Sequence, residues 1–288
     1  MQQVSSFQNQ DSGTLYLVPT PIGNLDDMTF RAVKVLTGAD LIAAEDTRHT
    51  QQLLNHFDIH TPEISFHEHN TEQRIPELIG KLKAGLTIVQ CSDAGMPSIS
   101  DPGKELVAAA VKEGIPVVPL PGANAGVTAL IASGLVPQPF YFYGFLERKH
   151  QQQVQELEQL RNRSETMIFY EAPHRLKKTL KVMAEVFGDD RQAVLARELT
   201  KRYEEFSRGS LAELTAFYDE HQPRGEYVVL IAGNPHPDEY VQNDEAGTPI
   251  EQIDQKISEG LSTNAAIKLV AKKNKLNRQE LYKQYHNI

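Results

Sequence analysis

Short apolar runs alternate with amphipathic, helix-like segments in the first half of this 288-residue chain, and this alternation constrains the fold more than any other feature. The runs that predict strands are residues 14–18, 40–44, 86–91 and 116–120. Between them, apolar residues recur at the helical spacing of about 3.6 residues. Such alternation is typical of a largely parallel sheet that helices cover on both faces. The sequence therefore predicts an α/β fold.

A long loop rich in Gly, Pro, Ser and Asp, residues 92–103, separates the strand predicted at 86–91 from the helix predicted at 104–112. Crossover loops of this kind need only about 2–6 residues, so the extra length favours a ligand-binding loop over a simple turn. A second loop, residues 121–126, leads from the strand at 116–120 into an apolar helix. Ligands of α/β proteins bind at the carboxyl ends of the strands, and we expect both loops at that edge of the sheet.

The second half of the chain mixes strands and helices in a less regular order, which indicates an α+β or mixed α/β module. Its predicted strands lie at residues 139–145, 166–171, 193–198, 206–209 and 226–232, and its predicted helices at 150–163, 173–187 and 210–220. Three further short helices are predicted at residues 249–259, 263–273 and 278–285. The predicted division is a flexible N-terminus at 1–12, α/β subdomains at 13–136 and 137–234, an acidic linker at 235–248 and a helical module at 249–288.

The formal net charge of −9 argues only mildly against a nucleic-acid partner, because the charges are unevenly distributed. All charged side chains between residues 238 and 254 are acidic. From residue 268 onward Glu280 stands against the basic residues Lys268, Lys272, Lys273, Lys275, Arg278 and Lys283. Such asymmetry is more informative than the total charge. Two interpretations of the last three helices stay open: a bundle that packs on the main body, or a contact with nucleic acid.

Cys91 is the only cysteine, so the chain forms no internal disulfide and has no cysteine-rich metal site. Its position inside an apolar strand predicts a packed thiol instead of a nucleophile. The first residues lack the basic and apolar regions of a signal peptide, and no apolar run approaches the length of a membrane span. These features predict a cytoplasmic protein with no membrane partner.

Several common catalytic motifs are absent from the sequence. No Gly-x-Gly-x-x-Gly follows the first strand, and there is no Gly-Lys-Ser/Thr loop and no Gly-x-Ser-x-Gly elbow. His67 and His69 lack a second cluster at ligand spacing, and no metal site is expected. What remains is a set of loops with small residues, which suits a reaction that depends on positioning. Methyl transfer from a sulfonium donor is one such reaction.

Six segments in chain order carry a resemblance to a known family. They are residues 18–25 (Val-Pro-Thr-Pro-Ile-Gly-Asn-Leu), 43–48 (Ala-Ala-Glu-Asp-Thr-Arg), 92–95 (Ser-Asp-Ala-Gly), 101–103 (Asp-Pro-Gly), 119–122 (Pro-Leu-Pro-Gly) and 169–175 (Phe-Tyr-Glu-Ala-Pro-His-Arg). Together they resemble the ribosomal RNA small subunit methyltransferase I family of the tetrapyrrole methylase superfamily. The resemblance runs from about residue 13 to 233, and the C-terminal helices also resemble that family's terminal module.

The resemblance implies a two-subdomain tetrapyrrole-methylase-like α/β fold with a small C-terminal helical module. It implies S-adenosylmethionine-dependent 2′-O-methylation of a cytidine ribose in the decoding region of 16S rRNA. The implied partners are 16S rRNA in the small ribosomal subunit and a second copy of the chain, as a homodimer. Two other functions stay open: a tetrapyrrole C-methyltransferase with the same donor site, against which the basic C-terminal helices speak, and a non-catalytic ribosome-binding factor.

By the same likeness, S-adenosylmethionine is the co-substrate. The residues implied to contact it are Pro21, Asp93, Ala94, Gly95, Met96, Asn124, Ala125, Tyr170, Arg197 and Glu198. Asp93 would accept hydrogen bonds from the donor, and the helix that begins near Ala125 would direct free N–H groups towards the donor's carboxylate. The candidates to orient or deprotonate the ribose hydroxyl are Glu45, Asp46, His174 and Glu198.

Three basic residues are hypothesised to hold RNA phosphates, namely Arg48, Arg175 and Lys201. Phosphate contacts of this kind position a strand without reading its sequence. The alternative for each is a surface ion pair. The chain departs from the family at two places: Asn124 stands where relatives usually have Ser, and residues 151–153 are three glutamines where a longer basic run is expected.

Overall fold

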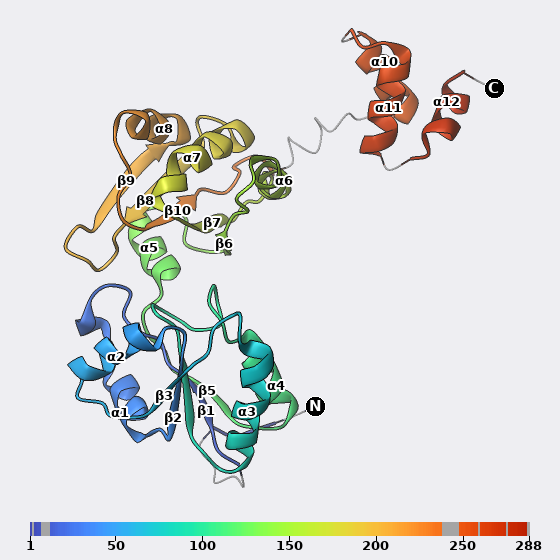
Figure 1. The fold of residues 1–288 in the computed structure, drawn as a ribbon. Helices are drawn as coiled ribbons and strands as arrows, with labels where there is room; N and C mark the ends of the chain where they lie inside the picture. Colours follow the sequence, from blue (N-terminus) through green and yellow to red (C-terminus); the bar gives the residue numbers. More distant parts are fainter. Residues whose placement is uncertain (2, 7–11, 238–247, 259, 275, 287–288) are drawn as a thin grey trace. The chain divides into compact units, whose positions relative to one another are not determined.

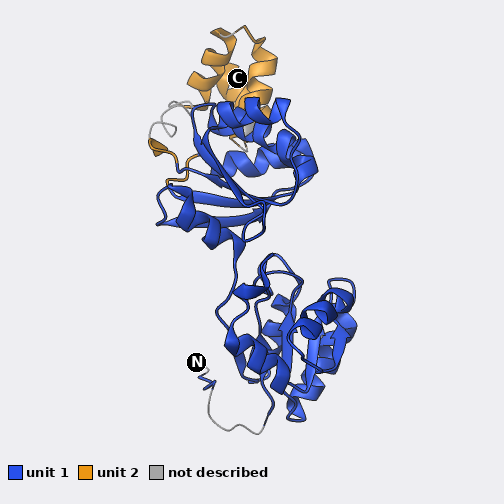
Figure 2. Ribbon diagram, turned by 90° about the vertical axis from the view of Figure 1, so that its left-hand side faces the viewer, with its two compact units in different colours: residues 1–161, 165–233 blue, residues 162–164, 234–288 orange. Residues whose placement is uncertain are grey.

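The fold is taken from a computed structural model, which describes residues 1, 3–6, 12–237, 248–258, 260–274 and 276–286. The chain divides into two compact units, shown in separate colours in Figure 2. Unit 1 comprises residues 1–161 and 165–233, and unit 2 comprises residues 162–164 and 234–288. Most of the acidic linker predicted at 235–248, and residues 7–11 of the N-terminus, lie outside the described residues.

The first half of unit 1 is built on a parallel five-stranded sheet, as the sequence predicted. The strands, in the spatial order β3-β2-β4-β1-β5, are Glu63–Ser65, Leu41–Ala44, Ile88–Cys91, Leu15–Leu17 and Val117–Pro119. Every neighbouring pair is parallel. The helices that join them are α1 (Phe30–Gly38), α2 (Thr47–His56), α3 (Thr71–Lys83) and α4 (Lys104–Lys112), and a 3₁₀ turn, η1, spans Leu25–Asp27.

These four helices cover both faces of the sheet (Figure 1). On one face, Leu36 of α1 and Leu54 of α2 pack with Val89 of β4 in one apolar cluster. On the other face, side chains of α3 and α4 pack with Leu15 and Ile88 in a second cluster. Because both faces are covered, the central strands are mostly apolar and do not alternate regularly with polar residues, as in β2, which is Leu-Ile-Ala-Ala. The predicted α/β class is confirmed.

One strand, β3, between α2 and α3, is not predicted by the sequence pattern. It has three residues, all of them only half-buried, and Ile64 is the one apolar side chain among them. Its strand character comes from its parallel pairing with β2, which places Ile64 opposite Ala43. A run this short carries too little periodicity to be recognised from sequence, because the pairing partner is remote in the chain.

The second half of unit 1 holds a mixed sheet. In the spatial order β6-β7-β10-β8-β9, its strands are Phe140–Phe145, Thr166–Glu171, Tyr227–Ile231, Gln192–Arg197 and Glu205–Ser210. β6 and β7 are parallel, and the other neighbours are antiparallel. The helices that follow strands of this sheet are α6 (His150–Leu160), α7 (Pro173–Phe187) and α8 (Leu211–Glu220), and their apolar residues share one cluster with the sheet. The expected mixed module is therefore present.

Helix α5 (Ala125–Ser133) follows β5 of the first sheet but packs on the second. Ala129 and Leu130 of α5 share a cluster with Ile168 of β7 and Leu230 of β10. Gly126 permits this approach, because a Cβ at that position would lie 3.3 Å from ring carbons of Phe142. Figure 1 shows α5 on the face of the second sheet opposite α7. The subdomain boundary expected at residue 136 stays a prediction.

The described part of unit 2 from residue 248 onward contains three helices, α10 (Pro249–Ser258), α11 (Thr263–Lys273) and α12 (Arg278–His286), close to the predicted ranges. They enclose a small apolar core made by Ile253, Ala266, Ile267, Val270, Ala271 and Leu281. The Asn277 side chain caps α12, since its Oδ1 accepts the N–H of Gln279 at 2.9 Å. Among the helices described in either unit, none is long and apolar enough to span a membrane.

Candidate active site

A cavity of about 420 Å³ opens in unit 1 beside the long loop that follows β4, and we call it the main pocket. Its walls come from Ile22, from residues 94–96 and 99–101, and from Asn124 and Ala125. The remaining walls belong to the second half of the unit: Phe145, residues 170–173, 196, 198–199, 201 and 226–228. The loops after β1, β4 and β5 therefore meet at one place, as expected for the carboxyl edge of a parallel sheet.

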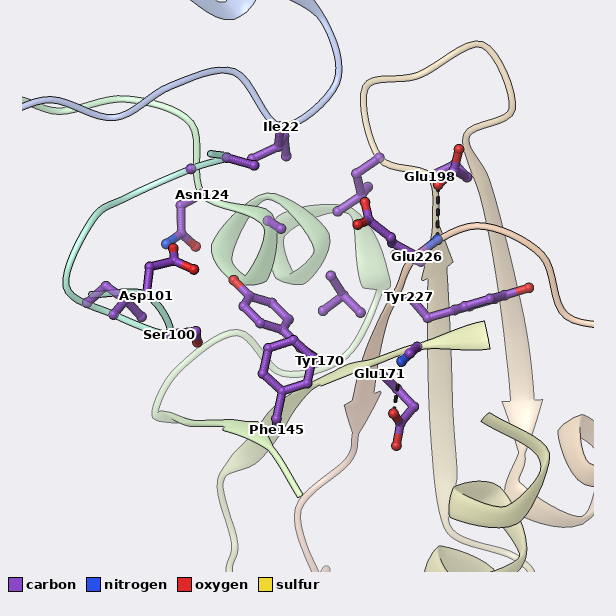
Figure 3. Close-up of a pocket in the computed structure, with 18 of the residues that line it drawn as sticks. Ile22, Ser100, Asp101, Asn124, Phe145, Tyr170, Glu171, Glu198, Glu226 and Tyr227 are labelled. Atoms are coloured by element: carbon purple, nitrogen blue, oxygen red, sulfur yellow. Dashed lines mark hydrogen bonds between the residues drawn. The ribbon is translucent and has the colours of Figure 1, made fainter. Parts of the chain in front are cut away.

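The lining of the main pocket is largely aromatic and aliphatic. The Tyr170 ring is flanked by Phe142 and Phe145, with ring centroids 5.2 and 5.5 Å apart in edge-to-face geometry. Figure 3 shows the Tyr170 hydroxyl pointing towards Asp101 and Asn124. That hydroxyl accepts the N–H of Gly126 at 3.2 Å, which fixes the ring against α5. An apolar pocket with a few placed polar groups is the usual form of a small-molecule site.

The loop at residues 92–103 is held on both sides. Thr20 and Gly95 exchange backbone hydrogen bonds of 3.0 Å, so the loops after β1 and β4 are tied together. Gly95 has φ +78°, a conformation that glycine adopts without strain. Further along, the Gln90 amide donates to the Pro102 carbonyl at 2.6 Å and holds the end of the loop against β4. The pocket wall is therefore preformed.

Asp101 is a carboxylate of the main pocket that is not among the residues expected to bind the donor. Burial, and beyond it the nearby Asp93 carboxylate, raises the pKa of Asp101 above its ordinary value. A cation placed beside Asp101 would offset that penalty, because an opposite charge favours the ionised form. The available signal was its Asp-Pro-Gly segment, which belongs to the family resemblance but has no local pattern that places it in a pocket.

Seven of the expected donor-binding residues line the main pocket: Ala94, Gly95, Met96, Asn124, Ala125, Tyr170 and Glu198. Pro21 and Asp93 instead line an adjoining cavity of about 410 Å³, which we call the side pocket. The two pockets share Ile22, Ala94, Lys201 and Glu226. Arg197 lines neither; its guanidinium lies 3.0 Å from a Glu205 carboxylate oxygen and donates to the Arg224 carbonyl at 2.9 Å.

The expectation of free N–H groups at the start of α5 is wrong for two of them. The Gly126 N–H donates to the Tyr170 hydroxyl, and the Val127 N–H donates to the Asn124 side chain at 2.9 Å. Asn124 is therefore the N-cap of α5, a role that Ser fills equally well. These groups orient the pocket wall, and they are not available to a ligand.

Two of the four candidate bases are strongly engaged with other protein groups. Asp46 caps α2 and accepts two hydrogen bonds from the Arg48 side chain, which lowers the pKa of Asp46 to about 2. Burial works to raise the pKa of Glu198, but hydrogen bonds from the Glu226 N–H and from Lys201 outweigh it, and the net pKa is lowered. The Glu226 N–H contact is drawn in Figure 3. Neither carboxylate is suited to take a proton near neutral pH.

The other two candidates lie outside the main pocket. His174 lines a separate cavity bordered by α6 and α7. Glu45 follows β2, and its carboxylate accepts the Asp93 N–H at 3.4 Å. Burial, followed by the repulsion of Asp101, raises the pKa of Glu45. Glu45 therefore lies beside the site, as expected, but it does not line the main pocket.

Each of the three residues expected to hold RNA has carboxylate partners. Arg48 pairs with Asp46 at 2.7 Å on the surface. Lys201 lies 3.0 Å from Glu198 and 2.9 Å from Glu226. Arg175 pairs with Glu171 at 3.2 Å and is largely enclosed. The ion-pair alternative thus describes all three side chains in this structure.

Two expectations concern reactive groups: Cys91 as a packed thiol, and His67 and His69, for which no metal site is expected. Cys91 is 2 % exposed, and burial raises the pKa of its thiol to about 12, so it is a packed side chain as predicted. Within the part of the chain that the structure describes, no group of three or more His, Cys, Asp or Glu side chains is placed to hold a metal ion.

Comparison with known proteins gives consistent results for sequence and fold. The family model of tetrapyrrole (corrin/porphyrin) methylases matches residues 14–215. The ribosomal RNA small subunit methyltransferase I of Streptococcus pyogenes serotype M18 is 53 % identical over 289 residues, which cover 100 % of both chains. The Bacillus subtilis protein of the same name is 51 % identical and covers 99 % of this chain and 98 % of its own.

Solved structures share the fold at lower identity. The uroporphyrin-III C-methyltransferase of Thermus thermophilus, complexed with S-adenosyl homocysteine, has a TM-score of 0.54 and 18 % identity, over 76 % of this chain and 97 % of that one. A diphthine synthase has a TM-score of 0.59 and 13 % identity, over 77 % of this chain and 90 % of that one. The chain therefore belongs to the tetrapyrrole methylase family and, within it, to the ribosomal RNA small subunit methyltransferase I family.

Proposed function

We propose that this S-adenosylmethionine-dependent methyltransferase methylates the ribose 2′-hydroxyl of a cytidine in the decoding region of 16S rRNA. The observation that carries the proposal is the extent of the match to the ribosomal RNA methyltransferases, which covers 100 % of the chain at 53 % identity. The porphyrin methylase structures cover only 76 % of it. The likeness to RNA enzymes thus includes the helices of unit 2, which favours RNA over a tetrapyrrole as the acceptor.

The donor is proposed to bind in the main pocket. Its sulfonium supplies a methyl group that is already activated for displacement. A cation gains from aromatic faces and from a partly buried carboxylate, and the main pocket offers Tyr170, Phe145 and Asp101. Gly95 lets the backbone approach a ligand closely. Of the remaining residues expected to touch the donor, Pro21 and Asp93 contribute to the adjoining side pocket.

Two of the basic residues are proposed to contact phosphates. Arg48 is exposed at the start of α2, and Lys201 stands at the wall between the two pockets. Both would exchange a carboxylate partner for a phosphate on binding RNA, and such contacts position the strand. The proposal does not extend to Arg175, because its side chain is only 19 % exposed and holds the protein's own backbone.

A homodimer in the cytoplasm is proposed as the working form. Support for self-association comes from apolar side chains on and just after α5 that are exposed in the single chain. Ile131 is 77 % exposed, and Val136 is 68 % exposed. Apolar side chains this exposed are a common feature of interaction surfaces. Sedimentation of the wild type and of Ile131→Asp tests it: a wild-type monomer would refute the dimer.

The proposed reaction is tested with purified protein, donor labelled in the methyl group, and immature small ribosomal subunits. The expected result is label on the 2′-oxygen of one cytidine, located by nuclease digestion and mass spectrometry. Label on a porphyrinoid offered in parallel, with none on RNA, would refute the proposal and favour the C-methyltransferase. Binding to subunits without any transfer would favour the ribosome-binding factor. Because phosphate contacts release counterions, RNA affinity is expected to fall steeply with salt.

A further inference from the structure

The side pocket adjoins the main pocket but has a different character. Its volume of about 410 Å³ lies within the range of about 300–1,000 Å³ usual for small-molecule sites. The shared walls at Ile22, Ala94 and Lys201 mean that a ligand there would lie next to the contents of the main pocket. Its polar groups include His49 and Asp93, which the main pocket lacks.

His49 stands near the start of α2, and its side chain is 60 % exposed. Its Nδ1 lies 3.9 Å from the Asp93 carboxylate. Asp93 is fixed in turn, because its Oδ1 accepts the N–H of Asp46 at 3.1 Å and its own N–H donates to Glu45. For the described residues, no protein hydrogen bond to His49 Nε2 is present. One ring nitrogen thus faces the Asp93 carboxylate, and the other is open.

Of the other titratable groups near the two pockets, Glu45 has a raised pKa but lines neither pocket. Asp46 and Glu198 are held by cations and have lowered pKa values. His174 lines a different cavity. Asp101 lines the main pocket, on the side proposed for the donor. In the side pocket, Lys201 forms ion pairs with two carboxylates, and the Asp93 carboxylate faces His49.

We propose that the side pocket takes the acceptor nucleoside of an RNA strand and that His49 is a catalytic residue that removes the proton of its 2′-hydroxyl, with Asp93 as a positioning residue. This inference rests on the proposed function. The 2′-oxygen attacks the donor's methyl carbon, and the new C–O bond forms as the S–CH₃ bond breaks. The sulfur keeps that electron pair and becomes the neutral thioether of S-adenosylhomocysteine. The hydroxyl proton passes to His49 Nε2 and from there to solvent.

The charges around His49 suit this step. A carboxylate oxygen of Asp93 lies 3.9 Å from the Nδ1 of the ring, away from the Nε2 that takes the proton. The Lys201 ammonium is neutralised by Glu198 and by Glu226, which also lines the side pocket. A His base beside a carboxylate is a common catalytic arrangement, and general-base catalysis contributes about 10²–10⁴-fold to a rate.

The test compares His49→Gln, His49→Ala and Asp93→Asn with the wild type in single-turnover methyl transfer to small subunits. The rate of both His49 variants is expected to fall by about 10²–10⁴-fold. In the two His49 variants, the donor affinity measured by calorimetry and the melting temperature should stay at wild-type values. Added imidazole should restore part of the rate in His49→Ala, because the side chain it replaces is exposed. It should not restore Asp93→Asn.

His56→Gln, an exposed position on the same helix, is the matched control and should keep the wild-type rate. A His49→Gln rate close to that of the wild type would overturn the inference. So would a loss that imidazole leaves unchanged in His49→Ala, because it would assign His49 a structural role. Failure of the proposed function would look different: the wild type itself would transfer no label to RNA.

Discussion

Replacing Arg175 by Ala separates a structural role from an RNA-binding role at this position. The Arg175 Nε lies 3.2 Å from the Glu171 carboxylate, and its guanidinium donates to the carbonyl oxygens of Leu146 and Glu147 at 2.8 and 3.0 Å. Glu171 has a side chain only 1 % exposed. It also accepts the Thr179 hydroxyl at 2.5 Å. The guanidinium therefore balances a buried charge and joins β7, α7 and the end of β6.

The expected cost follows from that geometry. Removing one partner of a buried ion pair costs about 3–5 kcal/mol, because the other charge is left uncompensated. Glu171 keeps its hydrogen bonds from Thr179 and from the Ala172 N–H, which places Arg175→Ala near the lower end, at about 3 kcal/mol. In a cooperative unit of about 150–250 residues, each kcal/mol lowers Tm by about 2–4 °C. The expected fall is therefore about 6–12 °C.

The measurement is thermal unfolding by calorimetry at neutral pH, with RNA affinity measured well below the transition. Lys178→Ala, exposed on the same helix, is the matched control and should change stability by less than about 0.5 kcal/mol. The double variant Arg175→Met with Glu171→Gln should recover much of the loss, since it removes the buried charge as well. An unchanged Tm together with lost RNA affinity would refute this reasoning and restore Arg175 as a phosphate contact.

Two further predictions concern the main pocket. Asp101→Asn should raise the melting temperature of the donor-free protein at neutral pH, because the folded state raises the Asp101 pKa and so disfavours its ionised form. The gain should be absent below about pH 3.9, the pKa of Asp101 in the unfolded chain, because Asp101 is then protonated in both states. It should grow as the pH rises from there through the raised pKa of the folded state, and then stay constant. A gain in melting temperature at low pH would contradict this prediction. Tyr170→Phe removes the acceptor of the Gly126 N–H and should cost about 1 kcal/mol in denaturant unfolding while the aromatic wall is kept. Unchanged stability would mean that this bond contributes nothing net.

The elements that sequence patterns predicted best are those whose signals are local. The bounds predicted for α4 and α7, 104–112 and 173–187, are the bounds observed. α7 begins with Pro173 in its first turn and ends before Gly188, which has φ +94°. Both signals act within one turn of helix, so a single sequence contains them. β3 had no such signal, because its pairing with β2 alone makes it a strand.

The part of the candidate site that was predicted is the part with a local sequence signal. The loop at 92–103 and the loop before α5 are long and rich in small residues, and such loops at strand ends mark a site before any contact is known. Asp101 and Phe145 joined the pocket only through packing. The side pocket, with His49 beside Asp93, was not predicted at all. It depends on α2 and the loop after β4 lying together, and neither segment indicates the other.

The sequence by itself thus determined the class of fold, the order of the elements, the family and the loops that carry the site. Only the tertiary structure decided which partners the charged side chains have. Asp46, Arg175 and Lys201 have the chemistry of a base or a phosphate contact in the sequence, yet each is paired in the folded chain. Lys201 and its partner Glu226 are 25 residues apart in the sequence. The Asp46 N–H donates a hydrogen bond to Asp93, which is 47 residues away. The pairs of Arg48 with Asp46 and of Arg175 with Glu171 join residues close in the sequence. The long-range contacts, and the burial of Glu171, depend on which distant segments pack together, and helix and strand signals do not reach that far.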